Sequence, residues 1–310
     1  MSPLLSVEDL RVRFRTMSQL KAFTSGVKNP FVDAVCGVSF EIRRGETLGL
    51  VGESGSGKST IARAIMGLRP PTSGSIRFDG QVLNGLAPAD RKLHLRRMAM
   101  MFQDPVGSLS PRLTVRSLLI EPFRIHGITI RDPAAEVERL LKMVGLPADF
   151  GRRYPHQLSG GQARRVGVAR ALALAPDLII ADEPTAGLDV SVQGEVLNLL
   201  GRLQQELGIA ILIITHNLNV VRHMTDRMAI MYLGRFIEVG STDRIFEQPC
   251  HPYTEALLSA NPEPDPDAAL DRIELSGEVP SLMTRPPGCE FHTRCRYAQD
   301  ICKSAFPSRT

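Results

Sequence analysis

Residues 52–60 read GESGSGKST, a run of glycines and hydroxyl-bearing residues around a single lysine. The preceding run ETLGLV, at 46–51, has the composition of a buried strand. The following run IARAIMGL, at 61–68, repeats apolar residues at helical spacing. A strand, a glycine-rich loop and a helix in this order fit the pattern G-x-x-x-x-G-K-[ST]. The stretch therefore predicts a phosphate-binding loop, whereas the same letters without these flanks would indicate a flexible turn.

Such a loop binds phosphate because its glycines let successive backbone N–H groups converge on one anion in front of a helix N-terminus. We expect Lys58 to bridge the β- and γ-phosphates of a nucleotide and Ser59 to offer its hydroxyl to Mg²⁺. The other nucleotide-binding residues predicted in this loop are Gly52, Glu53, Ser54, Gly55, Ser56, Gly57 and Thr60.

Acidic and polar residues follow further strand-like runs. The run LIIADE, at 178–183, predicts a buried strand that ends in two acids, with Asp182 in the Mg²⁺ shell and Glu183 as the general base for an attacking water. Without the phosphate loop, a solvated acidic turn would be the better interpretation. By the same logic His216 could contact the γ-phosphate, and Gln103 could reach Mg²⁺ and the attacking water.

Composition limits the other classes of function. The chain has 310 residues, a net charge of +4 and 43% hydrophobic residues, as in ordinary globular proteins. Its basic residues are dispersed, so nucleic-acid binding is not indicated. The N-terminus lacks a signal-peptide pattern, and no apolar run approaches the ~18 residues of a membrane span. We expect a cytoplasmic protein that reaches a membrane only through a partner.

The run LSGGQ, at 158–162, precedes the helical run 163–174 and predicts a second anion-binding helix start. Either the two phosphate-seeking ends meet within one molecule, or the second serves the nucleotide of another molecule. The residues assigned to this second end are Ser159, Gly160, Gly161 and Gln162.

Taken together, the chain resembles the ATPase subunits of ABC transporters over roughly residues 5–245. The motifs that carry the resemblance are, in order, 52–59, Gln103, LSGGQ at 158–162, 178–183, Asp189 and His216. The resemblance implies ATP hydrolysis by a head-to-tail dimer. Each ATP would lie between the phosphate loop of one subunit and the LSGGQ residues of the other, and the second subunit could be identical or a related ATPase.

The resemblance also assigns two further residues. Asp189, in AGLD, matches the loop that couples the two nucleotide sites, although the family more often has Ser-Ala in place of Ala186-Gly187. Phe31 is the nearest candidate for the aromatic ring that stacks on adenine, and a core or surface role is the alternative.

Two stretches resemble the branch that serves importers of oligopeptides, dipeptides and nickel. They are FQDPVGSLSPRLTV at 102–115 and a C-terminal part that contains HPYT at 251–254 and GCEFHTRCRYAQDIC at 288–302. The branch implies two membrane permease subunits, an extracytoplasmic solute-binding protein and a place at the cytoplasmic face of the inner membrane. The segment 112–122 would lie near the permease, or would be an ordinary buried helix.

The cysteines of the C-terminal part have the spacing C-x5-C-x6-C at Cys289, Cys295 and Cys302, which is not that of a zinc ribbon. Some members of the resembled branch carry a 4Fe-4S cluster here, which commonly needs four thiolates. Cys250 could replace the missing fourth ligand, and free or packed thiols are the alternative.

The expected fold is an α/β P-loop NTPase of the ABC ATPase type, with a RecA-like core, an antiparallel β subdomain, a helical subdomain and a small C-terminal extension. The ATPase domain would span 1–245, with the helical subdomain at about 111–175, and the extension would span 246–310. The expected core strands are 47–51, 98–102, 178–181 and 210–215, the N-terminal strands 5–14 and 38–42, and the hairpin strands 227–234 and 235–240. The other expected elements are helices at 134–146 and 253–260 and a strand at 273–280.

Two rival functions remain at this point. One is a non-transport ABC ATPase of repair or translation, which usually has two such domains or a long coiled-coil insert. The other is a metal- or redox-sensing regulator that uses the cysteines.

Overall fold

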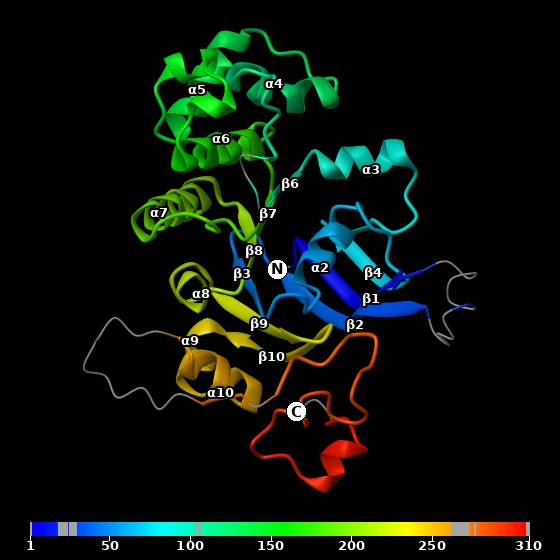
Figure 1. Cartoon of the computed structure of the whole chain (residues 1–310). Helices are drawn as coiled ribbons and strands as arrows, with labels where there is room; N and C mark the ends of the chain where they lie inside the picture. Colours follow the sequence, from blue (N-terminus) through cyan, green and yellow to red (C-terminus); the bar gives the residue numbers. More distant parts are fainter. Residues whose placement is uncertain are drawn as a thin grey trace. The chain divides into compact units, whose positions relative to one another are not determined.

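The computed structural model of the chain describes residues 2–17, 24, 30–102, 104, 107–261, 273–275 and 277–307 (Figure 1). The chain divides into two compact units, which are described separately. The first unit comprises Met1–Leu5, Glu41–Leu48 and Arg77–Thr215, and the second comprises Ser6–Phe40, Gly49–Ile76 and His216–Thr310. The domain boundary expected at 245/246 stays a prediction.

The first unit contains parallel strands that lie side by side in Figure 1: β6 (Met98–Met101), β7 (Leu178–Asp182) and β8 (Ala210–Thr215). In this register Leu178 is paired with both Met98 and Ala210. Every residue of β7 and β8 is buried, which explains their nearly continuous apolar sequences. The expected strands at these positions are confirmed.

Helices of the first unit occupy the range 111–175. They are α4 (Val115–Ile125), α5 (Pro133–Met143) and α6 (Gly160–Leu172), with the short turns η1 (Ala148–Arg152) and η2 (Pro155–Gln157). The three α-helices pack on one another in the green part of Figure 1. Helix α5 begins where the Asp132 carboxylate accepts N–H bonds from Ala134 and Ala135, and it buries an apolar stripe of Val137, Leu140 and Leu141. The remaining helices of this unit are α3 (Pro88–Leu95) and α7 (Val190–Leu207).

The second unit contains the sheet order β10-β9-β3. Strands β9 (Arg227–Tyr232) and β10 (Arg235–Ser241) form the expected antiparallel hairpin, and β3 (Thr47–Val51), whose first two residues belong to the first unit, neighbours β9. A buried core joins this sheet to the C-terminal part through Tyr232, Tyr253 and Phe291. The helices of this unit are α2 (Lys58–Ile65), α8 (Leu218–Met224), α9 (Thr242–Glu247), α10 (Pro252–Ser259) and the turn η3 (Asp300–Lys303).

A second sheet has the order β2-β1-β4-β5, and most of its residues belong to the second unit. Its strands are β1 (Leu5–Arg15), β2 (Phe31–Ile42), β4 (Ser73–Phe78) and β5 (Gln81–Val82). Strands β4 and β5 are antiparallel, with Phe78 paired to Gln81.

The expected strand at 273–280 is wrong for the part of this segment that the structure describes. Residues 273–275 and 277–280 have no strand pairing. Gly277 has a φ of +80° and Pro280 lacks an N–H, so this stretch cannot continue a ladder despite its apolar composition. Among the described residues, no helix is both long and apolar enough to cross a membrane.

Candidate nucleotide-binding site

The phosphate loop of the second unit has a backbone that requires glycine at Gly52 and Gly57. Their φ angles are +154° and +110°, which side-chain-bearing residues rarely adopt. A Cβ atom at Gly52 would collide with the carbonyl oxygen of Met231, and one at Gly57 would collide with that of Ala34. The loop is thus closely packed on neighbouring backbone, which fixes its path.

Lys58 is the first residue of α2 and is buried despite its charge. Its Nζ donates to the carbonyl oxygens of Gly52 at 2.7 Å and Glu53 at 2.9 Å, and to Ser56 Oγ at 3.4 Å. These bonds stabilise the buried ammonium group and hold it in front of the helix N-terminus. The arrangement places a fixed positive charge where the sequence predicts phosphate binding.

The LSGGQ residues open helix α6 in the first unit. Ser159 Oγ accepts the Gln162 N–H at 3.2 Å, and Gln162 Oε1 accepts the Ser159 N–H at 3.0 Å, which is a reciprocal capping box. Ser159 and Gly160 are exposed. A Cβ atom at Gly161 would lie 2.8 Å from Val192 Cγ1, so the helix start needs glycine there. This exposed helix start is suited to bind an anion from outside the unit.

The acidic pair of the first unit follows β7. Asp182 is buried, and Glu183 has a φ of +50°, a strained value for a residue with a side chain. The Glu183 N–H donates to the Ile214 carbonyl at 2.8 Å, and Thr215 Oγ1 donates to Glu183 Oε2 at 3.1 Å. The carboxylate of Glu183 is therefore oriented by strand β8.

Arg164, which our sequence reasoning missed, connects α6 with the loop after β7. Its side chain is 2% exposed, and its guanidinium donates to the carbonyl oxygens of Glu183 at 3.3 Å and Ala186 at 2.6 Å. Burial lowers its pKa. The signal was present in the sequence, since Arg164 precedes the buried Val168 and Leu172 at helical spacing.

We expect Arg164→Lys to lower the kcat of ATP hydrolysis about tenfold while the Kd for ATP changes little. Lysine keeps the charge but cannot bridge two carbonyl oxygens, so Glu183 would lose part of its support, at a cost of about 1–2 kcal/mol. Steady-state kinetics and ATP titration measure the two effects. Arg139→Gln, which removes an exposed ion pair with Glu136 in α5, is the matched control. An unchanged kcat for Arg164→Lys would contradict this role.

Further residues predicted for the nucleotide site are Asp189, Phe31, His216 and Gln103. Asp189 caps helix α7, where its carboxylate accepts the Val192 N–H at 2.9 Å. The Phe31 side chain is 41% exposed in the second unit, with the Arg13 guanidinium 6.0 Å from its ring centroid. His216 is exposed at the start of the last segment of that unit. Gln103 lies outside the described residues.

The cysteines do not support an iron–sulfur cluster. Among the residues that the structure describes, no group of three or more His, Cys, Asp or Glu side chains is arranged to hold a metal ion. Cys289 and Cys302 are joined through their backbones, with a 2.8 Å bond from the Cys289 N–H to the Cys302 carbonyl, and burial raises the pKa of the Cys289 thiol. Cys250 is exposed and Cys36 is a buried thiol.

Comparison with known proteins identifies the family. Residues 35–186 match the family model described as ABC transporter, and residues 237–302 match that of the oligopeptide/dipeptide transporter C-terminal region. A putative oligopeptide transport ATP-binding protein of Bacillus subtilis, YkfD, is 48% identical over 96% of this chain and 92% of its own length. The chain belongs to the ABC transporter ATPases. AppF of B. subtilis, an oligopeptide transport ATP-binding protein, is 49% identical to this ABC ATPase over 89% of this chain and 85% of its own length. A putative peptide import ATP-binding protein of Brucella ovis is 46% identical over 99% of this chain and 93% of its own length.

Solved structures confirm the fold of this ABC ATPase. The ATP-binding cassette MJ0796, solved as a dimer in a post-hydrolysis state with ADP and Pi, matches 77% of this chain and 98% of its own length, with a TM-score of 0.67 and 28% identity. The protein cbiO1 of Clostridium perfringens, part of an ABC transporter complex, matches 80% of this chain and 92% of its own length, with a TM-score of 0.66 and 30% identity. The expected P-loop ABC ATPase fold and ATPase activity are confirmed, and neither rival function draws support from these relatives.

Proposed function

We propose that this ABC ATPase drives an importer of oligopeptides or dipeptides, or of a related cargo such as nickel. The observation that carries the proposal is the C-terminal region at 237–302, which matches that of oligopeptide/dipeptide transporters, together with relatives named for peptide transport over nearly the full chain. The phosphate loop and LSGGQ are shared by all ABC ATPases and do not indicate the cargo. The region at 237–302 does, because it is characteristic of the oligopeptide/dipeptide transporters.

Within each nucleotide site, the phosphate loop binds the β- and γ-phosphates through its N–H groups and Lys58. The hydroxyl of Ser59 and the carboxylate of Asp182 are the hard oxygen donors that suit Mg²⁺, which would neutralise charge on the phosphates. Glu183 accepts a proton from the attacking water, and His216 and Gln103 orient the γ-phosphate and that water.

Two subunits complete two such sites. The exposed start of α6, with Ser159 and Gly160, binds the γ-phosphate of the ATP held by the phosphate loop of a second subunit, which is either identical or a related ATPase. ATP then acts as the contact that draws the subunits together, and hydrolysis releases them. The dimeric state of MJ0796 supports this arrangement.

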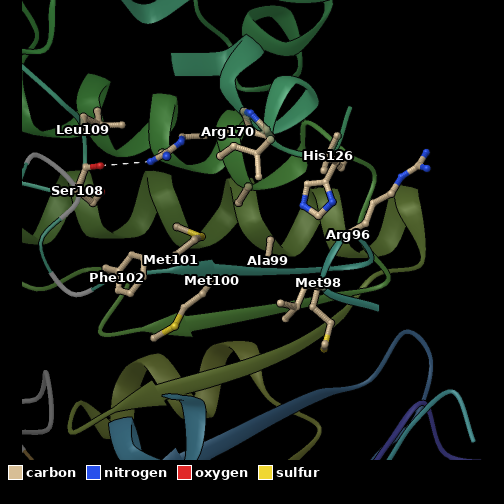
Figure 2. A pocket seen from close by; sticks show the side chains of 16 residues that line it. Arg96, Met98, Ala99, Met100, Met101, Phe102, Ser108, Leu109, His126 and Arg170 are labelled. Carbon is tan, nitrogen blue, oxygen red and sulfur yellow. Dashed lines mark hydrogen bonds between the residues drawn. The ribbon is translucent and has the colours of Figure 1, made fainter. Parts of the chain in front are cut away.

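The first unit has a partly apolar cavity that suits a permease segment (Figure 2). It measures about 220 Å³ and is lined by residues of β6, α4 and α6. Two of its lining residues, Phe102 and Ile125, are large apolar side chains that are 47% and 55% exposed, so they leave apolar surface open to a partner. Arg170 fixes one wall by donating to the Ser108 carbonyl at 3.2 Å and to Glu121 at 2.5 Å.

In contrast, the apolar residues of the segment 112–122 mostly face inward. Val115, Leu118, Leu119 and Ile120 are buried, so they form the buried side of α4, as the alternative of an ordinary buried helix expects. We propose that the cavity of each ATPase subunit binds a cytoplasmic helix of one of the two permease subunits. This contact would hold the ATPase at the cytoplasmic face of the inner membrane. A solute-binding protein would deliver cargo on the other side.

Co-purification with the two permease subunits, followed by uptake of a labelled oligopeptide into vesicles, tests this function. Ile125→Asp should abolish co-purification because a carboxylate at the cavity edge opposes apolar docking. Leu207→Asp is the matched control, since Leu207 is 49% exposed and does not line the cavity. Both variants should bind ATP like the wild type. Equal recovery of permease with the two variants would contradict the docking site, and uptake of neither peptide nor nickel would contradict the proposed cargo class.

A further inference from the structure

Glu53, the second residue of the phosphate loop, has its carbonyl oxygen, its N–H and its carboxylate all hydrogen-bonded to residues of the second unit. Its carbonyl oxygen accepts from Lys58 Nζ at 2.9 Å. Its N–H donates to the hydroxyl oxygen of Tyr253 at 3.2 Å. Its carboxylate oxygens accept from Arg294 Nη1 at 3.1 and 3.2 Å. Tyr253 and Arg294 lie 200 and 241 residues further along the chain, in the region at 237–302.

The two distant partners are firmly anchored. Tyr253 is completely buried, and its ring packs against Tyr232 with centroids 4.8 Å apart and against Phe291 at 5.5 Å. The Arg294 side chain is 8% exposed. Aromatic rings that are buried and in contact have little freedom to move, so the Tyr253 hydroxyl is held in a fixed position beside Glu53. The burial of Arg294 restricts its guanidinium in the same way.

We propose that Tyr253 and Arg294 are positioning residues that hold Glu53 and thereby set the affinity of the phosphate loop for ATP. The inference rests on the proposed role of residues 52–60 in phosphate binding. It gives the C-terminal region a function at the nucleotide, in addition to marking the transporter branch.

The charge of Glu53 makes this role specific. A carboxylate in a loop that binds a triphosphate repels the ligand, and the Arg294 guanidinium cancels that charge. Removing Arg294 leaves the loop with an unbalanced negative charge, whereas removing the charge of Glu53 leaves an unbalanced positive one. Neutralising Arg294 should therefore raise the Kd for ATP, and neutralising Glu53 should lower it. Loss of folding alone would raise the Kd in both variants.

The experiment measures the Kd for ATP by calorimetric titration of the full chain without Mg²⁺, which prevents hydrolysis. We expect Arg294→Gln to weaken binding about tenfold and Glu53→Gln to tighten it by a few fold, as for one unit charge in a partly solvated site. The double variant should return close to the wild-type Kd. Tyr253→Phe, which keeps the ring but removes the acceptor of the Glu53 N–H, should weaken binding about fivefold.

Arg296→Gln is the matched control because Arg296 lies two residues from Arg294 and pairs with Glu255, away from the loop. Equal Kd values for Arg294→Gln and Arg296→Gln would overturn the proposal, as would a double variant no better than Arg294→Gln alone. If Arg294→Gln does not fold, the Kd for ATP of Glu53→Gln tests the proposal by itself. Tighter binding by that variant supports the charge argument, and weaker binding overturns it. An unchanged Kd for Tyr253→Phe removes Tyr253 from the proposal.

Failure of the underlying assignment looks different. If Lys58→Ala binds ATP as well as the wild type does, the phosphate loop itself is misassigned. If Lys58→Ala loses ATP while Arg294→Gln matches Arg296→Gln, only the positioning role fails.

Discussion

Replacing Glu183 by Gln is expected to lower the steady-state rate of ATP hydrolysis about a thousandfold while leaving ATP bound, since a general base contributes on this scale. Glutamine preserves the shape of the side chain and can still accept the bond from Thr215 Oγ1. It cannot accept the proton of the attacking water. The backbone of Glu183 has a strained φ of +50°, and its N–H and carbonyl oxygen are held by Ile214 and Arg164, which is consistent with the proposed role of the carboxylate as a base.

The measurements are phosphate release for the rate and sedimentation for the assembly. Because ATP persists in the variant, its dimer should accumulate in the presence of ATP and disperse when ATP is removed. Glu195→Gln is the control, as Glu195 is exposed on α7 and pairs with Arg165. Full turnover by Glu183→Gln would remove Glu183 from the role of base.

Replacing Lys58 by Ala is expected to weaken ATP binding by about a hundredfold, because the site loses its charge-assisted bonds to the phosphates. The variant also leaves the carbonyl oxygens of Gly52 and Glu53 without the donor that they have in this structure. Calorimetric titration with ATP measures the loss.

Lys142→Ala, in the last turn of α5, is the control for removal of one positive charge. A thermal unfolding midpoint near that of the wild type would show that the loss belongs to the ligand. Binding of ATP by Lys58→Ala at wild-type strength would contradict the assignment of the phosphate loop.

Much of the architecture follows from local patterns in the sequence. The strands β7 and β8 were predictable because their apolar runs are continuous and short, as strands buried on both faces require. The start of α6 was predictable because LSGGQ precedes a run with helical spacing, and the structure adds the capping box between Ser159 and Gln162. The positive φ angles of Gly55 and Gly57, +81° and +110°, were predictable because a phosphate loop needs a backbone that side-chain-bearing residues rarely adopt.

The remaining features depend on contacts between distant parts of the chain. The pairing of Glu53 with Arg294 spans 241 residues, and no periodicity or motif encodes it. The strand expected at 273–280 failed because apolar composition does not supply a pairing partner. The cysteine spacing likewise suggested a cluster that the geometry of the described residues does not support.

The central claim is that each subunit supplies half of two composite nucleotide sites. The most direct measurement is the rate of ATP hydrolysis per chain, taken across a dilution series in which sedimentation reports the fraction of dimer, for the wild type and for Ser159→Arg, alone and with the partner ATPase. We predict that hydrolysis follows the dimer fraction and that Ser159→Arg retains ATP binding but loses dimerisation and turnover. Undiminished hydrolysis by a monomer, or by Ser159→Arg, would contradict the account.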